Sequence, residues 1–277
     1  MQMKCAWKEL LAILPARLRG PVGQVGAEDL WEIRIRLDRP TELVGSRGSV
    51  WLGDRGSRED IGFSVNTASR YSPWAAQSMK MGYITAPGGH RIGLGGETAV
   101  NEGAVTGFRE PDSLCIRVAK DFAGIARPFA GLTGSVLILG PPGSGKTTLL
   151  RDLCREWSRR EQVAVVDERG EIFPKGCDRG MALDVLSFCP KPLGLDMALR
   201  TLGPQTIALD EITGEGDAQA LLRAGWCGIR LIVTAHAASA EDLAKRPVYR
   251  ALWEDRLFEH LLICRRDKSR PTERVDL

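Results

Sequence analysis

The chain has 277 residues, of which 43% are hydrophobic and 26% are charged, and its formal net charge is +3. This length and composition suit one large or two ordinary globular domains. The small net charge gives no reason by itself to expect a nucleic-acid partner. The seven scattered cysteines form no Cys-x-x-Cys pair, which argues against a disulfide scaffold and against a zinc site.

The N-terminal segment predicts a packed helix. Its short apolar patch is interrupted by Lys8 and Glu9, which does not fit a cleaved signal peptide. Helical spacing predicts one buried face that carries Trp7, Leu10, Leu11 and Leu14. No apolar run approaches the roughly 18 residues that cross a bilayer, so we expect no membrane span. The scattered cysteines suit reduced thiols in the cytosol, so we expect a cytoplasmic protein, alone or peripheral to a membrane complex.

Short strands and turns follow. In EIRIRLDRP, apolar and basic residues alternate, so Ile33 and Ile35 should share one strand face and Arg34 and Arg36 the other. We expect further strands in TELVG and SVWL.

The end of this half predicts a helix after Pro73 and then a hairpin at 82–95. The hairpin is indicated by a Pro-Gly-Gly turn between two short apolar segments. We expect His90, next to this turn, to be a turn residue and not a ligand.

The second half alternates short apolar strands with helical segments. The strands are expected at 135–139, 163–167, 206–210, 230–234 and 260–264. Continuously apolar strands between helices indicate a parallel sheet that is covered on both faces. We therefore expect an α+β domain at 1–118, a linker at 119–130 and an α/β domain at 131–277.

A phosphate-binding loop follows the first of these strands. GPPGSGKTT fits the pattern G-x-x-x-x-G-K-[ST] in the order strand, loop, helix. We expect its backbone N–H groups to surround the phosphates of ATP, with Lys146 on the β- and γ-phosphates and the Thr147 hydroxyl on Mg²⁺. The predicted nucleotide-binding residues are Gly140, Pro141, Pro142, Gly143, Ser144, Gly145, Lys146, Thr147 and Thr148.

Two acids end the strand TIALDE. Asp210 is expected to hold Mg²⁺ through water or Thr147, and Glu211 to orient or deprotonate the attacking water.

The strand in VAVVDERGEI also ends in acids. Ligands of an open parallel sheet lie beyond the carboxyl ends of its strands, so Asp167, Glu168 and Glu171 should lie near the phosphates. We expect Glu168 or Glu171, or both, to be needed for hydrolysis. Alternatively, these acids pair with Arg169 in a surface loop.

A fourth strand, RLIVTAH, ends in Thr234 and His236. Both polar groups should emerge at the same edge of the sheet, where His236 would sense the γ-phosphate. A structural histidine is the equally weighted alternative.

With these elements in order, the sequence resembles the stage III sporulation protein AA family, relatives of the type II and type IV secretion ATPases. The resemblance rests on EIRIRLDRP, GYITAPGGHRIGLGG, SLCIRVAK, GPPGSGKTTLLRD, VVDERGEI, LDE and TAH. It implies a RecA-like P-loop core with a mainly parallel sheet, preceded by a smaller α+β domain. LLRAGWCGIR and TAHAAS match the family pattern only loosely.

The same resemblance implies an ATPase that forms a homo-hexameric ring. It would energise a channel between mother cell and forespore and bind membrane-embedded partner proteins there. In such relatives, arginines from the first domain or linker complete the ATP site. Arg117 in SLCIRVAK is the best match, and Arg109 is a weaker one. In the second half we expect only Arg169 at the sheet edge.

Other functions remain open at this point. A nucleotide-gated binding switch would need no dedicated base such as Glu211. A small-molecule kinase would need an arginine-rich lid, and none is clear. A GTPase is disfavoured because no Asn-Lys-x-Asp motif follows the P-loop. A nucleic-acid motor of the same fold would show salt-dependent binding to DNA.

Overall fold

The computed structural model describes residues 2–69, 79–174, 177–237, 239–267 and 272–277. The chain forms two compact units: Met3–Asp121 together with Pro174–Cys177, and Phe122–Phe173 together with Asp178–Leu277. The start of the helix expected after Pro73 falls in 70–78, outside the described residues. Two short strands, β1 (Gln2–Lys4) and β8 (Asp121–Ala123), pair with each other.

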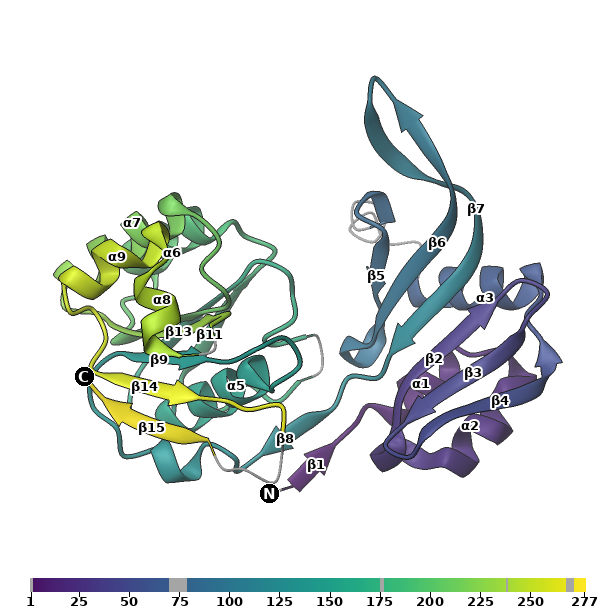
Figure 1. Cartoon of the computed structure of the whole chain (residues 1–277), viewed down its shortest axis with the longest axis horizontal. Coiled ribbons are helices and arrows are strands. Elements are labelled where there is room, and N and C mark those ends of the chain that lie inside the picture. The colour runs from purple at the N-terminus through teal and green to yellow at the C-terminus, as the bar shows by residue number, and fades with distance from the viewer. Residues whose placement is uncertain (1, 70–78, 175–176, 238, 268–271) are drawn as a thin grey trace. The chain divides into compact units, whose positions relative to one another are not determined.

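The N-terminal unit contains an antiparallel sheet of six strands in the order β4-β3-β2-β7-β6-β5 (Figure 1). The bounds of these strands are β2 Leu30–Arg36, β3 Pro40–Gly45, β4 Gly48–Arg55, β5 Tyr83–Thr85, β6 Arg91–Asn101 and β7 Ala104–Arg117. Its helices are α1 (Trp7–Ala12), α2 (Ala16–Asp29) and α3 (Arg58–Ser69).

The predicted packing of this unit is confirmed. Leu10 and Leu14 are fully buried in its core, and Trp7 and Leu11 pack against that core. The helix itself ends at Ala12, since Pro15 precedes a second helix.

The alternation in β2 is also confirmed. Ile33 and Ile35 are fully buried. On the other face, Arg34 pairs with Glu32 at 2.8 Å and Arg36 pairs with Glu42 at 3.0 Å. One face of the sheet therefore contributes to the core, and the other carries ion pairs.

The expected hairpin is present as β5 and β6, joined through η1 (Pro87–Gly89). His90 does end this turn, but it is fully buried, which the sequence analysis did not expect. Its Nδ1 accepts from the Ala119 N–H at 3.1 Å, and its Nε2 lies 2.9 Å from the Ala6 oxygen. The imidazole thus joins three distant segments of the unit, and burial lowers its pKa.

The second unit contains a seven-stranded sheet in the order β11-β10-β12-β13-β9-β14-β15. All neighbours are parallel except β14 and β15. The strands are β9 Val136–Leu139, β10 Val163–Asp167, β11 Leu183–Ser187, β12 Thr206–Leu209, β13 Arg230–Ala235, β14 His260–Ile263 and β15 Glu273–Asp276. All five expected strands are present; the edge strands β11 and β15 were not expected.

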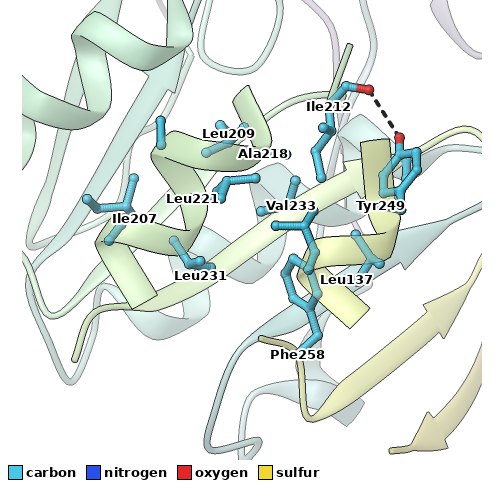
Figure 2. Close-up of a cluster of buried hydrophobic side chains, with 14 of the residues drawn as sticks. Leu137, Ile207, Leu209, Ile212, Ala218, Leu221, Leu231, Val233, Tyr249 and Phe258 are labelled. Carbon is cyan, nitrogen blue, oxygen red and sulfur yellow. Dashed lines mark hydrogen bonds between the residues drawn. The ribbon is translucent and has the colours of Figure 1, made fainter. Parts of the chain in front are cut away.

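Helices cover both faces of this sheet, as continuously apolar strands require. They are α5 Lys146–Trp157, α6 Lys191–Thr201, α7 Glu215–Trp226, α8 Ala240–Ala244 and α9 Pro247–Glu254, with η2 at Arg127–Phe129. Side chains of α6, α7 and α9 share one buried cluster with alternate residues of β9, β10, β12 and β13 (Figure 2). Helix α5 packs against β9 and β13.

The parallel register aligns the carboxyl ends of β9, β10, β12 and β13 along one edge. We call this edge the rim. Among the helices in the described ranges, none is long and apolar enough to cross a membrane.

Candidate active site

The P-loop at the rim has the backbone that its glycines predict. Gly140, Gly143 and Gly145 have φ values of 155°, 75° and 95°, which residues other than glycine rarely adopt. A Cβ on Gly140 would lie 2.5 Å from the backbone oxygen of Cys264. The loop therefore turns tightly from β9 into α5, whose N-terminus carries the free N–H groups that bind anions.

The Lys146 side chain contacts this loop and is buried. Only 6% of the residue is exposed, and its Nζ lies 3.2 Å from the Pro141 oxygen and 3.0 Å from His236 Nδ1. Burial lowers the pKa of Lys146, and the nearby carboxylates of Glu211 and Asp210 oppose that shift. The P-loop cation, the acids after β12 and the histidine after β13 thus share one site.

His236 connects Lys146 to Glu211, because its Nε2 lies 3.1 Å from Glu211 Oε2. A lysine ammonium only donates, so its contact makes Nδ1 of His236 the acceptor. The proton then resides on Nε2 and is donated to Glu211.

Asp210 directly follows β12, and its Oδ1 accepts a hydrogen bond from the Thr234 hydroxyl at 2.8 Å. Thr147 is the second residue of α5, at the same rim. A hydroxyl and a carboxylate are oxygen ligands of the kind that Mg²⁺ uses together with substrate phosphates. Thr147 and Asp210 therefore fit the ion predicted for this site.

Asp167, which we expected near the phosphates, lies at the rim but is buried. It is 1% exposed and accepts from three backbone N–H groups of its own loop, those of Glu171, Ile172 and Phe173, at 2.9–3.0 Å. Burial nevertheless raises its pKa. These three hydrogen bonds shape the loop that follows β10. The spacing of residues in the sequence does not reveal them.

The same loop is held by α5. Arg151 donates to the backbone oxygens of Ile172 and Glu171. The Glu171 carboxylate belongs to this loop, yet it is not among the groups that line the pocket described next.

A pocket at the rim brings the two groups of acids together. It is lined by Asp167, Glu168, Arg169, Lys191, Asp210 and Glu211. Glu168 Oε2 lies 3.2 Å from Lys191 Nζ, so its cationic partner comes from α6 and is not the neighbouring Arg169.

The sequence analysis missed Lys191. A signal was present: the residue follows Pro190 at the first position of a helix, where the helix dipole disfavours a cation unless acids neutralise it.

It also missed Arg266, which lies beyond β14. Its Nε donates to the Pro142 oxygen of the P-loop at 3.4 Å. Our expectation that Arg169 is the only arginine of this half at the rim was therefore wrong. The reason is that β14 pairs directly with β9, so the residues after β14 reach the P-loop.

The two arginines proposed from the first half lie in the N-terminal unit. Arg117 ends β7, is paired with Glu32 at 3.6 Å, and 67% of its side chain is exposed. Arg109 lies on the β6–β7 hairpin and pairs with Glu97 at 3.2 Å.

The model of the family "Sporulation stage III, protein AA" matches residues 6–275 of the chain. The chain is 38% identical over 284 residues to stage III sporulation protein AA of Bacillus subtilis (strain 168), covering 94% of this chain and 92% of that protein. The resemblance stated from the motifs is thereby confirmed.

Two solved structures are similar in fold. The ATPase DotB of Legionella pneumophila has a TM-score of 0.61 at 17% identity, covering 90% of this chain and 76% of that one. The pilus retraction motor PilT with bound ADP has a TM-score of 0.61 at 13% identity, covering 88% and 76%. The predicted fold, a mainly parallel α/β core preceded by an antiparallel sheet region, is confirmed.

Proposed function

The chain belongs to the stage III sporulation protein AA family, and from this premise we propose that it binds and hydrolyses ATP with Mg²⁺ at the rim. The observation that carries the proposal is the convergence of Lys146, His236, Glu211 and Asp210, which come from three different strand ends. A loop that merely closes a fold does not need a buried lysine, a histidine and a glutamate in a chain of contacts, with a second acid close enough to act on the lysine charge.

Each group has a role that its position supports. The P-loop N–H groups and Lys146 would hold the phosphates, and Thr147 with Asp210 would hold Mg²⁺, which neutralises phosphate charge when bound. Glu211 would take the proton of the attacking water. His236 already donates to that carboxylate, so it would orient Glu211 as well as sense the γ-phosphate.

Binding of ATP would have to release Lys146 from at least one of its two present partners. The ammonium cannot serve His236, the Pro141 oxygen and two phosphates with three protons. Leaving His236 frees Nδ1 of the imidazole to face a phosphate or a water. Occupation of the P-loop would in this way be transmitted to the group that holds Glu211.

We further propose that the protein works as a homo-hexameric motor or assembly ATPase that energises a channel complex in sporulation. It would act from the cytoplasmic side with membrane-embedded partner proteins. The family supports the setting, and the fold shared with DotB, named as an ATPase, and with the retraction motor PilT supports the motor.

Hydrolysis needs more positive charge than Lys146 and Mg²⁺ supply, and an added arginine is worth roughly three to five powers of ten in rate. Arg117 from the N-terminal unit is our first candidate, acting in its own chain or in a ring neighbour. Arg266, which contacts the P-loop, is the alternative.

The test is the Mg²⁺-dependent release of phosphate from ATP by the purified full-length chain. We expect turnover that rises with protein concentration as rings form, and none above background for Lys146→Ala. Tight ATP binding without turnover at any concentration would contradict the proposal and favour a nucleotide-gated switch.

A further inference from the structure

Lys191 occupies an unusual position next to the site. It is the first residue of α6, and only 4% of it is exposed. A buried ammonium at a helix N-terminus is doubly unfavourable, because burial and the helix dipole both oppose its charge. Such a group is retained only where anions surround it.

Three groups from two loops surround this ammonium. Its Nζ lies 3.2 Å from Glu168 Oε2, 3.3 Å from Asp217 Oδ2 and 3.3 Å from Thr213 Oγ1. Glu168 belongs to the loop after β10, whereas Thr213 and Asp217 belong to the loop after β12 and the start of α7. Lys191 therefore bridges the two loops that line the pocket.

Asp217 makes the second half of this bridge rigid. Its Oδ2 accepts from both the N–H and the hydroxyl of Thr213, each at 2.9 Å. The hydroxyl of Thr213 can donate to Asp217 while it accepts from Lys191, so it serves both neighbours at once.

The bridge holds the backbone that directly follows Glu211. Between Glu211 and Thr213 lies Ile212, whose N–H donates to the Thr234 oxygen at 3.3 Å and whose oxygen accepts from the Tyr249 hydroxyl at 3.0 Å. The contact between Thr213 and Asp217 thus adds to two anchors at Ile212, and together they fix the backbone that follows Glu211. Losing one of these anchors would loosen the placement of Glu211, and misplacing a catalytic group by about 1 Å can cost a hundredfold in rate.

We propose that Lys191 is a positioning residue of the ATPase site: it clamps Glu168 to Thr213 and Asp217 and thereby keeps Glu211 aligned for attack on the γ-phosphate. This inference rests on the proposed function. It also gives Glu168, which we expected to be needed for hydrolysis, the role of one end of the clamp.

The experiment uses Lys191→Met in the full-length chain, which keeps most of the apolar length of the side chain and removes its charged end. We expect turnover at saturating ATP to fall tenfold to a hundredfold. The affinity for a non-hydrolysable ATP analogue should stay within about threefold, because the P-loop is untouched. Lys245→Met, a change of an exposed lysine that follows α8, is the matched control and should change neither value.

A double variant separates the clamp from simple neutralisation of buried acids. If both side chains act through one bridge, Glu168→Gln/Lys191→Met should turn over no more slowly than Lys191→Met alone. Multiplied losses would overturn the inference. So would normal turnover of Lys191→Met, or a loss of analogue affinity as large as its loss of turnover.

Hydrogen exchange of the Thr213 amide reports the clamp without any turnover, since that N–H donates to Asp217. We expect faster exchange in Lys191→Met, and unchanged protection would overturn the clamp. Should Lys191→Met fail to fold, Glu168→Gln serves in its place, since the Glu168 side chain is 37% exposed. An inactive wild type would refute the proposed function alone, and Thr213 exchange would still decide the clamp.

Discussion

At the scale of single residues, the nucleotide-binding lysine and the rim histidine are already in contact. Lys146 and His236 come from α5 and the end of β13, far apart in sequence, and their nitrogens lie 3.0 Å apart. The sequence analysis weighed His236 equally as a sensor and as a structural residue. The contacts with Lys146 and Glu211 support the first interpretation.

Because of these contacts, replacing Lys146 and replacing His236 should affect ATP binding and turnover differently. Lys146→Ala removes a charged donor to phosphate and should weaken ATP binding roughly tenfold to a hundredfold, the size of a hydrogen bond to a charged group. His236→Ala should leave binding nearly unchanged and lower turnover, because Glu211 loses its donor. Calorimetric titration with a non-hydrolysable analogue checks this. Equal losses of affinity in both variants would show that His236 only supports Lys146.

The buried His90 should make the stability of the N-terminal unit sensitive to acid. Burial holds its pKa below the ordinary 6.5, so the unfolded chain binds the proton more tightly than the folded chain. Stability is therefore complete above about pH 6.5 and falls as the pH drops through that value towards the folded pKa. A proton on Nδ1 would also face the Ala119 N–H.

The measurement is thermal unfolding of the full-length chain between pH 7.5 and 5.5, in which His90→Gln should lose less stability than the wild type. Gln keeps one donor and one acceptor but does not titrate. His260→Gln is the control, because this imidazole, 13% exposed, pairs with Asp276 in the other unit. If His90→Gln and the wild type show the same pH dependence, the imidazole is not the titrating group.

At the scale of elements, strands with a continuous apolar run were predicted from the sequence, whereas strands with polar residues were not. Strands β9, β10, β12, β13 and β14 were predicted because both of their faces are apolar. The edge strand β11 reads LDVLS and β15 reads ERVD, so neither has an apolar run that marks a strand.

The residues of the site that belong to local motifs were predicted, and their partners were not. The motifs identified the P-loop and both acids after β12, since each carries a local pattern. The partners of Glu168 and Asp167 could not be read from the motifs. Lys191, the partner of Glu168, is in another element, and the backbone N–H groups reach Asp167 only through the path of its loop.

A hydrogen bond from helix α9 should stabilise the loop after β12. The buried Tyr249 hydroxyl donates to the Ile212 oxygen at 3.0 Å, and burial raises the pKa of Tyr249 to about 12 (Figure 2). Tyr249→Phe leaves that oxygen buried and unpaired, so the free energy of unfolding should fall by about 1–3 kcal/mol.

Urea unfolding of the full-length chain measures this loss. Tyr83→Phe is the control, because Phe keeps the stacking of that ring on Arg91. An unchanged unfolding midpoint for Tyr249→Phe would mean that water replaces the hydroxyl and that α9 does not hold the loop.

At the scale of the whole molecule, the open question is which arginine completes the ATP site. We expect Arg117→Ala to leave folding and nucleotide binding intact and to lower turnover by at least a hundredfold, whereas Arg266→Ala should cause the smaller loss. Phosphate release by each purified variant measures the two effects. The reverse order would move the role to Arg266 and to the second unit.

Mixing variants then tests whether sites are shared in a ring. Arg117→Ala and Glu211→Gln chains are each expected to be slow alone. Partial recovery of turnover in the mixture requires an arginine from one chain and a base from its neighbour. Light scattering with Mg²⁺ and ATP should show hexamers under the same conditions. No recovery in mixed hexamers would place the arginine in the same chain as the base.

The central claim is that the rim is a catalytic ATP site with Glu211 as its base, and one comparison tests it most directly. Single-turnover hydrolysis of Mg·ATP by the wild-type and Glu211→Gln chains should differ by about two to four powers of ten, the usual contribution of a general base. Bound ATP should be equal in both, because Gln keeps the shape of Glu and its contact with His236. Hydrolysis by Glu211→Gln at nearly the wild-type rate would contradict the account.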